Sequence, residues 1–328
     1  MQTNGNKRVV VVGDACLDII IPLKQFADNF EGRETSNIIP EISGGGTCAN
    51  TAVALKKLGI DTAYVGTLGT DYGGKFLYNE LNSFGIDTEF TVVDPDLNTA
   101  NVFAFIDAKG ERHMWAFPKE NLSFSYLDLS KIDLDKVKRS KWLHSSGMNY
   151  LFDGPILEVL PELFKIAFEA GVITSFDLNT RVAKPENLSY NISKAVRDTL
   201  PYVRYLLGSA KDEFYSFCPK EDWHDSVDSF VTKDRTVVAR IGSEGAYAVS
   251  VNEKVMQKPF DVPVVTTVGA GDAFNAGFIA SMISGKTLSD GVTWGNAVAS
   301  YKVMGVSSRH TPTKSQLDNF LLSHKIMI

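Results

Sequence analysis

A short glycine-rich segment that ends in a carboxylate, Gly269–Asp272, is the part of this sequence best suited to chemistry. It precedes the apolar run 273–278, so we expect a tight turn that opens a helix. Backbone N–H groups in such a turn, together with the positive end of the helix dipole, form a site for an anion. Asp272 would lie at the rim of that site and accept a proton from a group attacking the bound anion, as phosphoryl transfer requires. An aspartate at this position can also serve only as a helix cap.

Two further carboxylates lie near the amino end of the chain. The β-branched run 9–12 predicts a buried strand, which ends at Gly13 and Asp14, and Asp18 follows among apolar neighbours. Carboxylates near the end of a central strand suit a hydroxyl-rich ligand, because each of them accepts several hydrogen bonds. Asp14 could instead only cap a turn.

A second glycine-rich segment, residues 43–52, leads into apolar residues at helical spacing and closes at Gly59. Small residues at a helix start let a ligand approach the backbone closely, and Asn50 offers both a donor and an acceptor. The segment therefore predicts a site for a sugar-sized ligand. The alternative is a glycine-rich loop that only permits tight packing.

Strands and helices alternate in the second half of the sequence, which predicts a parallel sheet with helices on its faces. We expect a strand at 142–146, a helix at 155–170 and a strand at 172–177. Polar residues follow three of the expected strands, at 177–181, 210–213 and 240–245. Because ligands bind beyond the carboxyl ends of strands in open parallel sheets, these residues should face one crevice.

Residues 101–117 alternate around the polar stretch 107–112 and predict a hairpin. Aromatic residues on both arms, including Phe103, Phe105 and Trp115, need cover on one face, which indicates a partner surface or a closed lid. We therefore expect a homodimer in which two lids pack together.

The composition is that of an ordinary soluble globular chain. With 328 residues, of which 44% are hydrophobic, it can bury a large core. The net charge of −6 argues against nucleic acid or an anionic membrane as the main partner. No segment approaches the roughly 20 apolar residues of a membrane span. Three scattered cysteines, Cys16, Cys48 and Cys218, indicate neither a zinc site nor a disulfide framework, so we expect a cytoplasmic protein.

These motifs resemble those of the PfkB carbohydrate kinases, which have the ribokinase-like fold. Residues 264–278 are similar to the C-terminal signature of that family, 44–59 to its N-terminal one, and 13–18 to its opening sugar-binding strand. The resemblance implies an α/β fold with a doubly wound, mostly parallel sheet flanked by helices and a small β-sheet lid. We expect a single kinase domain over residues 1–328, with the lid built from segments at about 14–42 and 98–120.

The resemblance also implies roles for individual residues. Asp272 would be the catalytic base, and the anion hole would comprise Gly269, Ala270, Gly271 and Asp272. The sugar would be held by Asp14, Asp18, Gly45, Gly46 and Asn50. Arg181 would bind either an acidic substrate or the ATP phosphates. The nucleotide would be held by Asn179, Arg240, Gly242, Gly245 and Asn296. Glu213 would organise Mg²⁺ through water.

Two positions depart from the family pattern. Ala210 replaces the asparagine that begins the N-x-x-E element, whose carboxylate is kept as Glu213. Thr266 replaces the first aspartate of D-T-x-G-A-G-D, and this removes a negative charge that would help to bind a monovalent cation. We therefore expect ATP and Mg²⁺ as cofactors and little effect of K⁺.

The predicted activity is ATP-dependent phosphorylation of a primary hydroxyl on a small sugar or sugar acid, of the ribose, fructose or 2-keto-3-deoxy sugar acid type. Such a transfer depends on alignment and charge stabilisation more than on covalent chemistry. A nucleoside kinase of the adenosine type is an alternative within the same fold. A catalytically silent sugar-binding regulator is a third possibility, which the retention of Asp272 disfavours. A nicotinamide oxidoreductase is disfavoured too, because residues 9–14 lack G-x-G-x-x-G.

Overall fold

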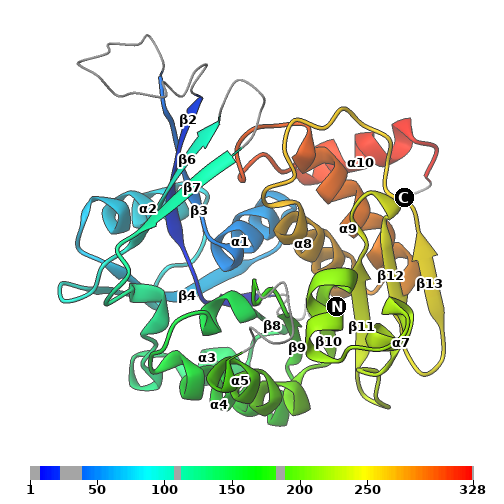
Figure 1. The fold of residues 1–328 in the computed structure, drawn as a ribbon, viewed down its shortest axis with the longest axis horizontal. Helices are drawn as coiled ribbons and strands as arrows, with labels where there is room; N and C mark the ends of the chain where they lie inside the picture. The colour runs from blue at the N-terminus through cyan, green and yellow to red at the C-terminus, as the bar shows by residue number, and fades with distance from the viewer. Residues whose placement is uncertain (1–7, 23–38, 107–111, 182–188, 327–328) are drawn as a thin grey trace, which may run out of the picture.

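The fold contains one large and one small sheet (Figure 1). The computed structural model describes residues 8–22, 39–106, 112–181 and 189–326. The large sheet has nine strands in the order β13-β12-β11-β10-β9-β8-β1-β4-β5. Their bounds are β1 (Val9–Val12), β4 (Thr62–Gly69), β5 (Thr91–Asp94), β8 (Trp142–Ser146), β9 (Ile173–Asp177), β10 (Tyr205–Ser209), β11 (Thr236–Arg240), β12 (Ala246–Val249) and β13 (Lys254–Gln257).

The large sheet is mostly parallel. Strands β5, β4, β1, β8, β9, β10 and β11 pair in parallel, whereas β12 and β13 continue the sheet antiparallel. The parallel strands therefore end at a common edge, where the sequence places its polar residues. The predicted mostly parallel sheet is confirmed.

Strand β1 shows why this sheet must be covered on both faces. All of its residues are apolar and buried, and alternate side chains enter different cores: Val9 and Val11 belong to one apolar cluster, Val10 and Val12 to another. Helices on the first side are α1 (Thr47–Lys57), α2 (Tyr72–Ser83), α8 (Ala270–Ile283), α9 (Leu288–Val303) and α10 (Lys314–Ser323). The remaining helices are α3 (Leu134–Lys138), α4 (Ile156–Glu169), α5 (Tyr190–Thr199), α6 (Tyr215–Phe217) and α7 (Trp223–Asp228). Within the described ranges, none of these helices combines the length and apolar character that crossing a membrane requires.

The small sheet has four strands in the order β3-β2-β6-β7 and lies beside α1 and α2 (Figure 1). Its strands are β2 (Cys16–Pro22), β3 (Glu41–Gly45), β6 (Ala100–Ile106) and β7 (Arg112–Phe117). The antiparallel pairing of β6 with β7 confirms the predicted hairpin. The hairpin tip at 107–111 and residues 23–38 of the predicted lid lie outside the described residues. The predicted fold, a doubly wound sheet with a small sheet as its lid, is confirmed.

Candidate active site

The turn at Gly269–Asp272, which opens α8 and is called the anion turn below, has the geometry expected of an anion site. Gly269 adopts a left-handed conformation with φ 78°, which favours glycine, and α8 begins at the next residue. A side chain at this position would also bring its Cβ to 3.3 Å from the Cβ of Ser308. The N–H of Ala270, the first residue of α8, donates to the carbonyl of Thr267. The N–H groups that follow it in the first turn of a helix have no acceptor within the helix, so they can bind an anion beside the positive end of the dipole.

Asp272 lies in the first turn of α8 and is 7% exposed. Its Oδ2 accepts a 2.7 Å hydrogen bond from Nδ2 of Asn50 on α1. Burial raises the pKa of Asp272 to about 7, and the hydrogen bond from Asn50 opposes part of that rise. A carboxyl group with this pKa can exchange a proton near neutral pH, as a general base must.

Arg309 fixes the orientation of the Asn50 side chain. Its Nη1 donates a 2.7 Å hydrogen bond to Oδ1 of Asn50, so the amide NH₂ group is turned toward Asp272. Nη2 of Arg309 lies 3.2 Å from Oε2 of Glu80, whose Oε1 accepts a hydrogen bond from the backbone N–H of Gly44. No sequence motif pointed to Arg309 or Glu80, because only the fold brings them to the glycine-rich segment.

Asp14 caps the N-terminus of α1. Its carboxylate oxygens accept hydrogen bonds of 2.7 Å from the N–H of Thr47 and 3.0 Å from the N–H of Cys48. The sequence suggested a turn cap as the alternative for Asp14, whereas in this structure Asp14 accepts from the first N–H groups of a helix. Each carboxylate oxygen has a second lone pair, so the predicted contact with a sugar stays compatible with the cap. Gly46 precedes the helix at φ 91°, again a conformation that favours glycine.

Asp18 lies on β2 opposite Ser43 of β3. A Cβ at Gly45 would come within 2.3 Å of Oδ2 of Asp18, so the glycine leaves room for the carboxylate. Burial raises the pKa of Asp18 above its ordinary value. The Ser43 hydroxyl has no hydrogen-bond partner among the residues that the structure describes. Asp18 and Ser43 thus offer an acceptor and an unused hydroxyl near the glycine-rich segment.

A closed polar network lies behind the first turn of α8. Arg240 donates 2.7 Å hydrogen bonds to Asp177 and to Asn275, and Asn275 donates a 2.7 Å hydrogen bond to the other carboxylate oxygen of Asp177. A Cβ at Gly271 would lie 3.4 Å from Nε of Arg240. Arg240 therefore lies beside Gly271 of the turn, and its predicted contact with a nucleotide stays a prediction.

Glu213 extends this network. Its Oε2 accepts a 2.6 Å hydrogen bond from the N–H of Ser209 and lies 3.7 Å from Nη2 of Arg240. Burial, reinforced by the charge of Asp177, raises the pKa of Glu213 to about 7, whereas Arg240 and Arg181 oppose the rise. No cluster of three metal-ligating side chains occurs in the part of the chain that is described. Mg²⁺ is commonly held by one or two carboxylates together with substrate phosphates, and Glu213 fits that arrangement.

The other predicted ligands lie in two places, one near Asp272 and one near strands β11 to β13. Asn179 donates a 3.0 Å hydrogen bond to Oγ1 of Thr47, and the charge of Arg181 lowers the pKa of Asp272, so both lie on the Asp272 side. Asn296 instead donates to the carbonyls of Gln257 and Lys258, each at 3.2 Å, and ties α9 to the end of β13. Gly242 and Gly245, at φ 59° and 104°, form the turn between β11 and β12.

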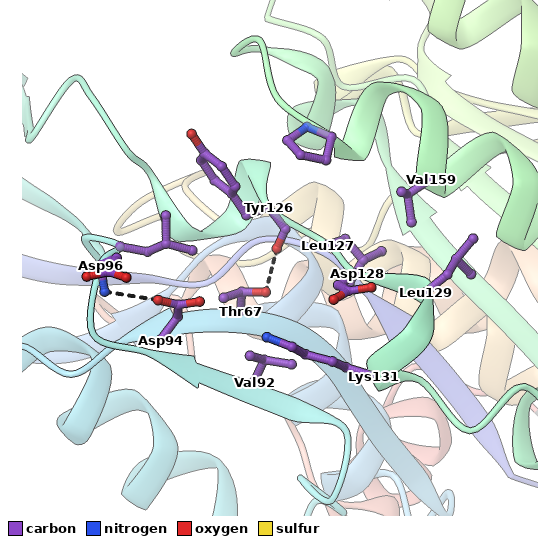
Figure 2. Close-up of a pocket in the computed structure, with 12 residues that line it drawn as sticks. Thr67, Val92, Asp94, Asp96, Tyr126, Leu127, Asp128, Leu129, Lys131 and Val159 are labelled. Carbon is purple, nitrogen blue, oxygen red and sulfur yellow. Dashed lines mark hydrogen bonds between the residues drawn. The ribbon is translucent and has the colours of Figure 1, made fainter.

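Figure 2 shows a cavity that residues of β4 and β5 line in part. Its volume is about 590 Å³. Tyr126 and Leu127 lie on one side of it, and Asp94 and Asp96 lie on another. None of the predicted site residues lines this cavity. The candidate active site is therefore defined by the contacts around Asp272 and not by this hollow.

Known proteins resemble the chain over nearly its full length. The sequence model of the pfkB family of carbohydrate kinases matches residues 6–314. A 5-dehydro-2-deoxygluconokinase from Bacillus licheniformis is 28% identical over 95% of this chain and 95% of that protein. An aminoimidazole riboside kinase from Salmonella typhimurium is 27% identical over 97% of this chain and 96% of that protein. A solved structure of a ribokinase II candidate from E. coli, in complex with ATP and Mg²⁺, has a TM-score of 0.83 at 20% identity, covering 97% of this chain and all (100%) of that one.

Proposed function

Because the chain belongs to the pfkB family of carbohydrate kinases, we propose that it transfers the γ-phosphoryl group of ATP to a primary hydroxyl of a small sugar or sugar acid. Sugar phosphorylation is the activity of this family, and the chain is a phosphotransferase. The proposal adds the acceptor group and the residues that act on it. One observation carries it: Asp272 is a buried carboxyl group with a pKa of about 7 in the first turn of a helix whose N-terminus has no side-chain cap.

In the proposed reaction, an oxygen of Asp272 accepts the proton of the acceptor hydroxyl. The hydroxyl oxygen then forms its bond to the γ-phosphorus, and the bond from that phosphorus to the ADP oxygen breaks. The N–H groups at the start of α8 stabilise the negative charge on the transferred group. Mg²⁺ would neutralise phosphate charge when bound. Glu213 would hold it through water, and Asn50 would keep the Asp272 carboxylate in place.

The polar groups around the glycine-rich segment support a small hydroxylated acceptor. Asp14, Asp18 and Ser43 supply acceptors and a hydroxyl there, and Asn50 contributes its amide. The positive charge of Arg181 acts on Asp272 and would favour an acidic acceptor such as a sugar acid. The relative named 5-dehydro-2-deoxygluconokinase supports this class.

A nucleoside acceptor is the second candidate. The relative named aminoimidazole riboside kinase, which is 27% identical, favours it, because a riboside presents a sugar hydroxyl on a heterocycle. For either acceptor, we propose that ATP lies against the β11–β12 turn at Gly242 and Gly245 and near Asn296. Residues 1–328 would form a single kinase domain with the small sheet as its lid.

A substrate panel tests the proposal. ADP release should be measured with ATP and Mg²⁺ against simple sugars, 2-keto-3-deoxy sugar acids, sugar phosphates and nucleosides, with Asp272→Asn as the inactive control. We expect a sugar or sugar acid to give the highest kcat/KM and the product to carry phosphate on a primary carbon, as read by NMR. Preference for nucleosides would select the second candidate. Acceptor-dependent ADP release that Asp272→Asn retains in full would refute the assigned base.

A further inference from the structure

Lys302, in the last turn of α9, is fully buried, with 0% of its surface exposed. Burying an ammonium group is costly unless the protein compensates its charge, so lysine is rarely found in such a position. The role of this lysine is not explained by the proposed transfer. Its Nζ lies 3.4 Å from the carbonyl oxygen of Gly305, just beyond the end of the helix.

The Lys302 side chain reaches the turn that opens α8. A Cβ at Gly269 would lie 3.5 Å from Cε of Lys302. The segment before the turn is bound to the same helix end, because the N–H groups of Val265 and Thr266 both donate to the carbonyl of Val303, at 2.8 and 3.2 Å. The ammonium therefore lies at the junction between the C-terminal end of α9 and the anion turn.

This junction favours a cation for two physical reasons. The carbonyl groups at the end of α9 form the negative end of its dipole, which stabilises a positive charge. The turn on the other side must keep its N–H groups aimed at an anion, and a positive charge behind it assists both the anion and that orientation. A buried site at the C-terminal end of a helix would otherwise suit an exchangeable monovalent cation.

We propose that Lys302 is a positioning residue for phosphoryl transfer, whose ammonium acts as a built-in cation under the Gly269–Asp272 turn. It holds the turn in its donor geometry and makes an exchangeable monovalent cation unnecessary. This inference rests on the proposed function, because the turn is assigned there to the transferred phosphoryl group.

The position of Lys302 also changes an expectation for Thr266. From the sequence alone, Thr266→Asp should introduce K⁺ dependence if the surrounding carbonyls are suitably placed. With Lys302 in place, its ammonium repels K⁺ and provides a partner for any new carboxylate nearby. We therefore expect Thr266→Asp to stay insensitive to K⁺. The double variant Thr266→Asp/Lys302→Met should require K⁺.

Lys302→Met tests the proposal, because methionine keeps much of the length and removes the charge. In a tetramethylammonium buffer, kcat should fall by at least about 10-fold, which is less than the roughly 10²-fold or more for losing a direct donor to a transition-state anion, because Lys302 acts through the turn. Addition of K⁺ or NH₄⁺ at constant ionic strength should restore part of that loss in a saturable way. Lys57→Met is the control: Lys57 is partly buried and, like Lys302, lies within hydrogen-bond distance of a backbone carbonyl, that of Arg309, at 3.0 Å. It should show no rescue.

A thermal readout needs no substrate and so separates this inference from the proposed function. The melting temperature of Lys302→Met should rise with K⁺ or NH₄⁺, because a ligand that binds the folded state stabilises it, whereas wild type and Lys57→Met should not respond. Equal responses of wild type and Lys302→Met would overturn the proposal. If Lys302→Met does not fold, wild type decides: its rate should change by less than about twofold between K⁺ and tetramethylammonium at constant ionic strength. Strong activation of wild type by K⁺ would also overturn it.

Discussion

The side-chain amide of Asn50 donates a 2.7 Å hydrogen bond to the carboxylate of Asp272, across 222 positions of sequence. The contact joins α1, which follows the glycine-rich segment, to α8, which follows the anion turn. It is buried, so the hydrogen bond is not exchanged freely for water. The group proposed to hold the sugar and the group proposed to take its proton are therefore held as a unit.

The first prediction concerns the proposed base. Asp272→Asn keeps the shape of the side chain and removes its ability to accept a proton, so kcat should fall by at least roughly 10²-fold. Substrate binding should change little, and the shift in melting temperature on adding the acceptor measures it. Near-normal turnover would show that another group takes the proton.

The second prediction concerns pH. Because burial raises the pKa of Asp272 to about 7, the carboxyl group is protonated and inactive as a base below that value. The kcat/KM should therefore decline as pH falls from 8 to 6, approaching about tenfold per pH unit on the acid side. Glu213 also has a pKa of about 7, so the profile should be repeated with Glu213→Gln. The acid limb should persist there, and its loss would assign it to Glu213.

Some features of the candidate site could be predicted from the sequence, and others could not. Gly46 and Gly269 adopt left-handed conformations beside helix starts, and such local requirements leave a motif in the sequence. The strand ends at Asp177 and Arg240 were also predictable, because parallel strands share one edge. Which partner each side chain meets was not predictable. Arg240 bonds to Asp177 and Asn275, which no motif indicates, and its predicted contact with the nucleotide stays a prediction.

Three charged residues near the site were not predicted from the sequence, because none of them belongs to a motif. Arg309, Glu80 and Lys302 lie in segments of ordinary composition, and their charges would usually be exposed. Only tertiary packing brings them to the two glycine-rich segments, where Arg309 and Lys302 are buried and the Glu80 side chain is 14% exposed. Asp14 was singled out from the sequence as a ligand or a turn cap, and the structure shows that it caps α1, a helix that begins 33 positions later.

The third prediction concerns Mg²⁺. Glu213→Gln removes the charge proposed to organise the metal through water, so the variant should need more Mg²⁺ for half-maximal rate. The rate should be measured against Mg²⁺ at fixed ATP. Glu162→Gln, an exposed carboxylate on α4 that pairs with Lys165, is the control and should behave as wild type. An unchanged Mg²⁺ dependence in Glu213→Gln would make Glu213 a structural residue.

The fourth prediction concerns assembly through the small sheet. The rings of Phe103, Trp115 and Phe117 contact one another on one face, and Trp115 is 63% exposed. We expect two such faces to pack in a homodimer, so Trp115→Glu should give a monomer at micromolar concentration by analytical ultracentrifugation. Met114 is 65% exposed and alternates with Trp115 along β7, so Met114→Glu on the other face is the matched control. A monomeric wild type would refute the dimer.

The last prediction separates two roles of Arg309. Arg309→Met frees the Asn50 amide to rotate away from Asp272, so kcat should fall by about 10-fold or more. The same change leaves Glu80, whose side chain is 14% exposed, without its ionic partner, which should lower the free energy of unfolding by about 1–3 kcal/mol. Adding Glu80→Gln removes that unpaired charge. The double variant Glu80→Gln/Arg309→Met should therefore recover much of the melting temperature but not kcat. Recovery of both would show that Arg309 only neutralises Glu80 and that the Asn50 amide keeps its orientation without help.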